Sequence, residues 1–253
     1  MPWDPARYEQ FKKERFAPFD DLLALVRVRS GLRAIDLGCG TGELTRRLAD
    51  ALPESDVLGI DSSAEMLERS KEFVRPGLRF EVRSIQDVEG EWDLICSNAA
   101  LHWLPDHGTV FPRLFERVCA GGQLVVQMPS NYRHPTHTFI DDIASEEPFG
   151  AVFDGYRRAW LANDIEQYAQ MLYDCRATDI LVFEKVYPHV LPDADALADW
   201  TSGTALVPYM ERLPVDLHEP FMERYRARLQ ERFPQTPVFY GFRRILISAS
   251  KSS

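Results

Sequence analysis

Three glycines at alternate positions, Gly38, Gly40 and Gly42, mark the stretch of this chain best suited to bind a ligand. They follow the apolar run of residues 34–37, which is typical of a buried parallel strand, and a helical stripe of leucines comes after them. Glycines have no Cβ atom, so a ligand can lie directly against the backbone of such a strand-to-helix turn. The turn therefore favours a nucleotide, although glycine turns also occur for structural reasons alone.

The spacing of the glycines and the residue after them argue against a nucleotide with phosphates. The dinucleotide fingerprint is Gly-x-Gly-x-x-Gly, one residue longer than the pattern here. Glu43 falls in the first turn of the following helix, where free N–H groups and the helix dipole would otherwise hold a pyrophosphate. Because a carboxylate there repels phosphate, we expect an adenosine ligand without phosphate, such as S-adenosylmethionine (SAM). An NAD(P)-dependent oxidoreductase is the rival enzymatic interpretation.

A second acidic residue, Asp61, ends the apolar strand predicted at residues 57–60. An acidic side chain at the tip of the second strand, about 20 residues beyond the glycines, is placed to accept hydrogen bonds from ribose hydroxyls. Ser62 or Ser63 can then cap a helix that begins at Ala64. Asp61 could instead serve only as a helix cap, but together with the glycine turn it predicts an adenosine site.

The elements that must position these residues alternate between strand and helix up to residue 129. An amphipathic helix carrying Leu22, Leu23 and Val26 precedes the first strand. Beyond residue 129 the alternation stops, and helical or loop-like stretches at residues 130–176 and 192–238 separate the last two strands. The whole pattern predicts an α/β fold with a Rossmann-like sheet of seven strands. Besides the two strands above, we predict strands at residues 78–82, 92–97, 123–128, 180–187 and 242–249, helices at 64–74 and from Pro105 to Val118, and a turn at Gly121 and Gly122.

Residues that follow the fourth strand are expected to face the reactive end of the cofactor. Ligands of open α/β sheets bind beyond the carboxyl ends of the strands, and Asn98, His102 and Trp103 all follow this strand. Trp103 is interpreted as a wall of the pocket. His102 could simply pack beside it, but its place after the strand favours contact with the substrate.

Composition narrows the class of protein. The 253 residues suffice for one sizeable α/β domain, and the hydrophobic content of 45% supports a full core. A net charge of −10 argues against a nucleic-acid partner. The four cysteines show no C-x-x-C pairing, and we predict reduced thiols in the cytoplasm and no metal. No hydrophobic leader or long apolar run is present, so no membrane partner is expected, and we predict a monomer.

The glycine turn with Asp61 resembles the class I SAM-dependent methyltransferases, which implies a sheet whose last strand is antiparallel. In that family an acidic residue before the glycines, here Asp36, meets the amino-acid end of the cofactor. The turn after the third strand meets adenine, which points to Ser84 and the Ile85 backbone, with Asp87 as the alternative. Small-molecule methyltransferases often fold an N-terminal segment over the cofactor, a role for Trp3 and Tyr8, for which aromatic packing on the core is the alternative. The predicted cofactor-binding residues are thus Tyr8, Asp36, Gly38, Cys39, Gly40, Gly42, Asp61, Ser62, Ser84, Ile85 and Asn98.

A narrower resemblance, to the trans-aconitate methyltransferases, extends over nearly the whole chain. It rests on residues 97–107, 127–131, 135–137 and 242–244, on Tyr8, Phe11, Glu14 and Arg15, and on Trp200, Gly203 and Thr204. It implies O-methylation of one carboxylate of a small polycarboxylic acid, most simply trans-aconitate, to a monomethyl ester, with S-adenosylhomocysteine (SAH) as the second product. The N/D-P-P-Y sequence of many amino-group methyltransferases is absent.

A carboxylate nucleophile needs cationic and hydrogen-bonding groups rather than a base, because it is ionised at pH 7. Arg243 and Arg244 lie in a strand and must point to opposite faces, and we expect Arg244 to reach the pocket. Two residues depart from the family pattern: Val207 stands in place of an arginine and His102 in place of the more frequent glutamine. The predicted substrate-binding residues are His102, Trp103, Arg133, His137, Tyr209 and Arg244, for which surface exposure or ordinary packing is the alternative.

We therefore predict a single methyltransferase domain over residues 1–253. Its core covers about residues 18–129, 177–191 and 239–251, with an N-terminal cover at residues 1–17 and lid insertions over the substrate at 130–176 and 192–238. The alternatives are a SAM-dependent methyltransferase of another small molecule and a non-catalytic SAM-binding protein.

Overall fold

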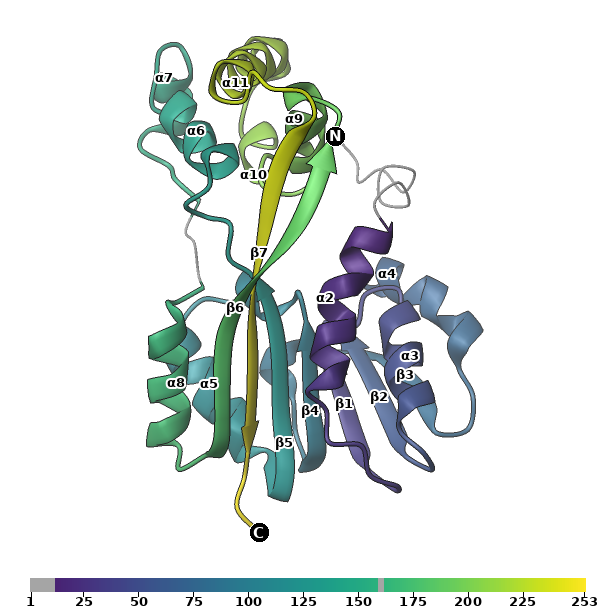
Figure 1. Ribbon diagram of the computed structural model, residues 1–253. Helices are drawn as coiled ribbons and strands as arrows, with labels where there is room; N and C mark the ends of the chain where they lie inside the picture. Colours follow the sequence, from purple (N-terminus) through teal and green to yellow (C-terminus); the bar gives the residue numbers. More distant parts are fainter. Residues whose placement is uncertain (1–11, 159–161) are drawn as a thin grey trace. The chain divides into compact units, whose positions relative to one another are not determined.

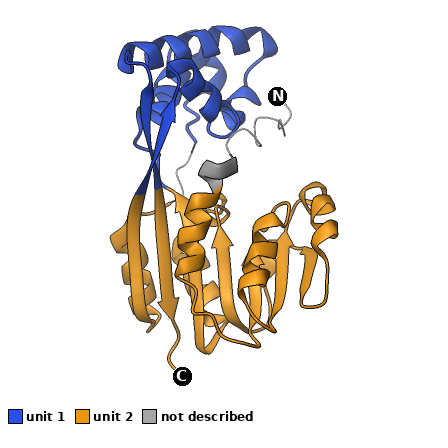
Figure 2. Cartoon of the chain, turned by 45° about the vertical axis from the view of Figure 1, so that its right-hand side comes forward, with its two compact units in different colours: residues 1–15, 130–160, 186–243 blue, residues 16–129, 161–185, 244–253 orange. Residues whose placement is uncertain are grey.

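The computed structural model describes residues 12–158 and 162–253 (Figure 1). Trp3 and Tyr8, predicted to cover the cofactor, lie outside these residues. The chain forms two compact units (Figure 2). Unit 1 consists of residues 1–15, 130–160 and 186–243, and unit 2 of residues 16–129, 161–185 and 244–253. The division of the chain into core, cover and lid insertions stays a prediction.

A seven-stranded sheet in the order β3-β2-β1-β4-β5-β7-β6 organises the fold. Strands β1 to β5 pair in parallel, and β7 runs antiparallel to β5, as the family resemblance implied. All seven predicted strands are confirmed. Their bounds are β1 (Arg33–Leu37), β2 (Asp56–Asp61), β3 (Leu78–Val82), β4 (Trp92–Asn98), β5 (Val118–Pro129), β6 (Thr178–Leu191) and β7 (Val238–Ser250).

The fifth strand begins earlier than its sequence predicts. Val118, predicted to end the preceding helix, instead pairs with Trp92 as the first residue of β5. The prediction of a turn at Gly121 and Gly122 is likewise wrong, because both glycines lie within this strand. The register shifts between Trp92 and Leu94, and this irregularity accommodates the extra residues of β5 before regular pairing resumes at Gln123.

Helices cover both faces of the sheet within unit 2. On one face, α2 (Lys12–Ala24) and α3 (Glu43–Ala51) bury residues such as Leu22 and Leu48 against β1, β2, β4 and β5. On the other face, α5 (His107–Glu116) and α8 (Ile165–Asp174) bury Phe111 and Tyr168. Two shorter helical stretches follow β2, namely α4 (Ala64–Glu68) and the 3-10 helix η1 (Arg69–Phe73). Both sheet faces are therefore apolar, as parallel strands require.

Unit 1 has a core of its own. Its helix α11 (His218–Arg232) buries the predicted stripe of Phe221, Tyr225 and Leu229 completely. These side chains pack in one apolar cluster with residues of its other helices and of β6 and β7. The remaining helices of unit 1 are α6 (Pro135–Ala144), α7 (Phe149–Phe153), α9 (Ala194–Ser202), α10 (Val207–Met210) and the 3-10 helix η4 (Val215–Leu217). Among the described residues, no helix is long and apolar enough to cross a membrane.

Candidate functional site

The glycine turn after β1 is held against the end of β2. The N–H groups of Gly38 and Cys39 both donate to the carbonyl oxygen of Ile60, at 2.8 and 2.9 Å. Gly38, Gly40 and Gly42 have φ angles of 72°, 56° and 79°, in the left-handed region that favours glycine. The turn leads directly into α3 at Glu43. The predicted strand-to-helix turn is therefore present, and its conformation requires this residue type.

Asp61 is bound by the backbone on both of its carboxylate oxygens. Oδ2 accepts a hydrogen bond from the Gly40 N–H and Oδ1 one from the Ser63 N–H, both at 2.9 Å. The cap of α4 is Ser63, whose Oγ accepts from the Met66 N–H at 3.2 Å. Each carboxylate oxygen can accept a further bond, so Asp61 keeps the capacity to bind ribose hydroxyls. The neighbouring Ser62 is exposed.

Asp36 is a buried carboxylate in the same turn. It is only 3% exposed, and its Oδ2 accepts a hydrogen bond from Thr45 Oγ1 at 2.6 Å. Burial raises its pKa from 3.8 to about 6; the Thr45 hydroxyl partly opposes this rise and the charge of Asp61 adds to it. The described part of the chain provides no ion pair for this group. A cationic group of a ligand would lower the cost of its charge.

The chain after β4 lies directly on the glycine turn. A Cβ atom built on Gly38 would stand 2.3 Å from Cβ of Ala100 and 3.7 Å from Cδ1 of Ile85. Ala99 adopts a positive φ of 53°, a strained conformation for a residue other than glycine, and its N–H donates to the Gln127 carbonyl at 2.9 Å. The chain segments that follow β1, β3 and β4 therefore meet at Gly38.

Ser84, Asp87 and Cys39 lie in different surroundings. Ser84 caps the 3-10 helix η2 (Ile85–Asp87), where its Oγ accepts from the Gln86 N–H at 3.2 Å. Asp87 is exposed. Whether Ser84 or Asp87 meets adenine stays a prediction. Burial, foremost, raises the pKa of the Cys39 thiol, so this group is neutral and not a nucleophile.

His102 and Trp103 lie in the 3-10 helix η3 (Leu101–Trp103), with ring centroids 4.8 Å apart. Trp103 is 54% exposed. Our sequence analysis missed His107, which holds this segment in place. Its Nε2 lies 3.0 Å from the Leu101 carbonyl oxygen and its Nδ1 2.6 Å from the Tyr168 hydroxyl. Burial lowers its pKa below 6.5, so a neutral ring joins η3 to α8.

Polar side chains gather on one face of the sheet where its central strands end. Alternation along each strand places Asp36, Asn98, Gln127 and Arg244 on the face that carries α2 and α3, since their neighbours Ile35, Ile95, Val126 and Ile245 all pack on the other face. Arg244 is 8% exposed, whereas Arg243 is exposed. The two arginines thus differ as predicted for adjacent strand residues. We predicted no role for Gln127 from the sequence. A glutamine inside an apolar strand was the feature that could have identified it as a candidate site residue.

The other predicted substrate residues belong to unit 1. Arg133 is exposed, with its guanidinium carbon 5.3 Å from the centre of the Tyr132 ring. His137 Nδ1 lies 2.9 Å from Thr136 Oγ1, and burial, chiefly, lowers its pKa to about 3. The Tyr209 hydroxyl donates to Asp141 and accepts from the Arg158 N–H at 3.0 Å. The substrate roles of these residues stay predictions.

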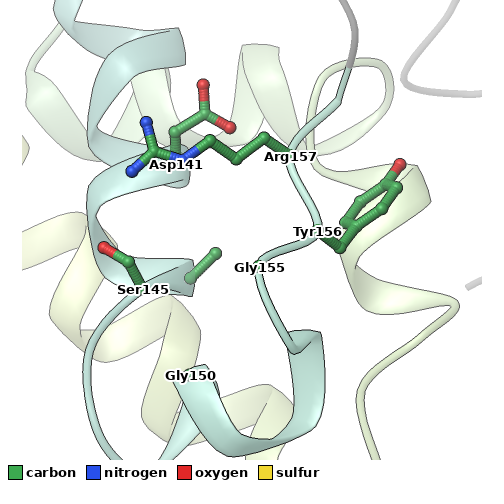
Figure 3. Close-up of a pocket in the computed structure, with 7 residues that line it drawn as sticks. Asp141, Ser145, Gly150, Gly155, Tyr156 and Arg157 are labelled. Carbon is green, nitrogen blue, oxygen red and sulfur yellow. The ribbon is translucent and has the colours of Figure 1, made fainter.

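A hollow within unit 1 lies beside α6 and α7 (Figure 3). Its lining includes the Asp141 carboxylate that accepts from Tyr209, but none of the predicted site residues. The other residues that line it are Ala144, Ser145, Gly150, Gly155, Tyr156 and Arg157. Within the described residues, no group of three or more histidine, cysteine or acidic side chains could hold a metal.

Comparisons with known proteins agree with this geometry. A family model described as a methyltransferase domain matches residues 28–192. The chain is 44% identical over 257 residues to a trans-aconitate 2-methyltransferase of Deinococcus radiodurans, covering 99% of both chains. Its fold is similar to that of the YcgJ protein from Bacillus subtilis (TM-score 0.62, 13% identity, 94% of this chain and 99% of that one). It is also similar to Haemonchus contortus phosphoethanolamine N-methyltransferase 2 in complex with S-adenosyl-L-methionine (TM-score 0.55, 16% identity, 94% of this chain and 52% of that one).

Proposed function

The chain belongs to the SAM-dependent methyltransferases, and on this premise we propose that it methylates one carboxylate of trans-aconitate to give a monomethyl ester and SAH. The observation that carries this proposal is the full-length match, at 44% identity, to a relative named trans-aconitate 2-methyltransferase. The chain reaches this identity although His102 and Val207 depart from the family pattern. They are the positions at which a preference for a related acid would be sought first.

The residues of the glycine turn fit SAM. Asp36 is a buried carboxylate with a raised pKa, and it suits the ammonium group at the amino-acid end of the cofactor. Asp61 has remaining acceptor capacity for the ribose hydroxyls. The contact of Gly38 with Ala100 leaves the turn narrow, and Ile85 beside it offers an apolar side chain and a backbone for adenine. These roles are part of the proposal.

Methyl transfer requires alignment more than acid–base chemistry. SAM supplies a methyl group on a positively charged sulfur, which an acceptor oxygen displaces in line. A carboxylate acceptor is already ionised at pH 7, so no residue has to remove a proton. The protein must hold the carboxylate in place and offset its charge, which contributes to rate through proximity. In our proposal Arg244 supplies that charge, because a buried guanidinium binds a carboxylate through two parallel hydrogen bonds.

Mass spectrometry of the products tests the function. The protein is incubated with SAM and one candidate acceptor at a time: trans-aconitate, cis-aconitate, citrate, itaconate, a simple fatty acid, a simple amine or a phenol. We expect a mass increase of one methyl group on trans-aconitate, with SAH formed in equal amount. Turnover only with amines or phenols would contradict a carboxylate acceptor. SAM binding without turnover of any acid would instead favour a non-catalytic SAM-binding protein.

We also propose a location and an assembly for the protein. The four cysteines, Cys39, Cys96, Cys119 and Cys175, are free thiols, which supports a reducing compartment such as the cytoplasm. We propose a monomer whose substrate is a small carboxylic acid. Gel filtration with light scattering would test the monomer directly.

A further inference from the structure

Gln127 is a buried residue whose amide oxygen has no hydrogen-bond partner among the described residues. The residue is 1% exposed, its Oε1 is fully buried, and its side chain makes no hydrogen bond to any residue that the structure describes. Gln123 lies on the same face of the same strand and forms a direct contrast. Its Oε1 accepts from the Arg27 N–H at 2.9 Å, and its Nε2 donates to the Leu25 carbonyl at 2.8 Å and to Ser248 Oγ at 2.9 Å.

A buried amide with no partner destabilises the fold, so it calls for an explanation. Its position supplies one. Gln127 is the register partner of Asn98 on β4, whose Oδ1 is also buried and without a partner in the described part of the chain. The two residues are neighbours on strands about 4.8 Å apart. Two amide oxygens that lack partners in the described part of the chain therefore stand side by side near the ends of β4 and β5.

Arg244 completes this arrangement on the other side of Gln127. Gln127 pairs with Leu246 of β7, and Arg244 comes two residues from Leu246 on the same face, opposite Pro129. Such diagonal neighbours across a strand pair lie roughly 7–8 Å apart, within reach of long side chains. Gln127 thus lies between Asn98, the last residue of β4, and the buried cation of Arg244.

We propose that the Gln127 amide donates a hydrogen bond to the nucleophilic carboxylate of the substrate and so determines specificity for acids, an inference that rests on the proposed function. Rotation of the amide exchanges Oε1 and Nε2, so the place that Oε1 occupies without a partner can equally hold the Nε2 donor, and a carboxylate accepts several hydrogen bonds at once. Arg244 neutralises the acid, while Gln127 positions its reacting oxygen without a second positive charge that would weaken the nucleophile.

The first test compares Q127M with the matched variant Q123M. Q127M removes an amide without partners, so its unfolding temperature is expected to equal or exceed that of the wild type. Its kcat/KM for trans-aconitate should fall by about tenfold or more, while its Kd values for SAM and SAH, measured by calorimetry, stay unchanged. Q123M should show the reverse pattern, with a lower unfolding temperature and an unchanged KM.

The second test uses Q127E and its pH profile. At pH 7.5 the added carboxylate repels the substrate, so kcat/KM should fall further than in Q127M. As the pH is lowered towards 5.5, this buried glutamate becomes protonated and its O–H can donate, so activity relative to the wild type should recover. A purely structural role for Gln127 would not produce this recovery.

Several outcomes would overturn the inference. These are an unchanged KM and kcat in Q127M, a loss of SAM affinity that accounts for the loss of activity, or a Q127E variant with no relative recovery at low pH. A failure of the proposed function is a different result, because the wild type itself would then show no turnover of any acid.

Discussion

At the scale of single residues, Asp61 has a structural role in the turn and a proposed role in binding ribose. Its two oxygens already accept the N–H groups of Gly40 and Ser63, so it shapes the turn that it is proposed to complete. We predict that Asp61→Ala weakens SAM binding, because the ribose hydroxyls and two backbone N–H groups lose their acceptor. Lost hydrogen bonds of this kind cost about 1–3 kcal/mol, which calorimetric titration with SAM would detect.

Asp61→Asn is the matched control. One side-chain oxygen remains to accept from the backbone, and the negative charge is lost. An affinity between those of the wild type and Asp61→Ala is expected. Unchanged SAM affinity in a folded Asp61→Ala variant would show that Asp61 only closes the turn.

Asp36 predicts a pH dependence of cofactor binding. Its pKa is raised to about 6 by burial, so the carboxylate takes up a proton as the pH falls through that value. The protonated form cannot pair with an ammonium group, and SAM affinity should weaken about tenfold between pH 7 and pH 5. Protonation of Asp36 has the opposite effect on the free energy of unfolding of the ligand-free protein, to which it contributes more as the pH falls. Between pH 6 and 3.8 the folded state binds more protons at Asp36 than the unfolded state, so this group favours folding as the pH falls.

Titration calorimetry at several pH values checks the Asp36 prediction. The control is Asp36→Asn, which should bind SAM weakly with little change over the same range. A wild-type affinity that is flat between pH 7 and pH 5 would contradict a role for Asp36 at the ammonium end.

Some of these residue roles could be predicted from the sequence, and others could not. The Ser63 cap was predictable because its acceptor and donor lie three residues apart. His107 was not, because its partner Tyr168 is 61 residues away and belongs to another helix. Gln127 was visible as a polar residue in an apolar strand, but only the folded register shows that its amide has no partner while that of Gln123 does.

At the scale of elements, the glycine turn and the chain after β4 depend on one close contact. We predict that Gly38→Ala destabilises the protein and weakens SAM binding, because the added Cβ would stand 2.3 Å from Cβ of Ala100 at a φ of 72°. The backbone conformation alone costs about 1–3 kcal/mol, and the clash adds to it by displacing the chain after β4. Thermal unfolding and SAM titration measure the two effects.

Gly31→Ala separates these contributions. Gly31 has nearly the same φ, 75°, but no atom lies within 4 Å of its added Cβ. It should therefore show the conformational cost alone and keep the SAM affinity of the wild type. If Gly38→Ala and Gly31→Ala weakened SAM binding equally, the contact between Gly38 and Ala100 would have no specific role in SAM binding.

The strands and helices could be predicted from the sequence wherever a local apolar pattern determines them. Seven apolar segments with helices between them predicted the seven strands. The start of β5 could not be predicted from the sequence, because Val118 continues the apolar spacing of the preceding helix. Only its pairing with Trp92 places it in the sheet. Sequence periodicity cannot report such a pairing, which is decided by a residue 26 positions earlier.

At the scale of the whole molecule, buried carboxylate and histidine side chains respond to acid with opposite signs, and unit 2 contains one of each kind, Asp36 and His107. Asp36 in unit 2 favours folding as the pH falls. In unit 1, burial first, and then the charges of Arg232 and Arg243, lower the pKa of His134 to about 4. His137 has the same sign. Between pH 6.5 and 4 the unfolded state binds more protons at His134 than the folded state, so the free energy of unfolding falls with pH.

We predict that α6 in unit 1 loses protection before α3 in unit 2 as the pH is lowered from 7 to 5. His134 caps this helix, since its Nδ1 accepts from the Thr136 N–H at 3.2 Å, and a charged ring cannot accept. Hydrogen exchange followed by mass spectrometry would show faster exchange in α6 at pH 5, after correction for the intrinsic rate, with α3 as the internal reference. His134→Asn keeps a capping acceptor that does not titrate, so it should reduce this difference. If wild type and His134→Asn lost protection in α6 equally, protonation of His134 would not be the cause, and the acid response of unit 1 would have to come from His137.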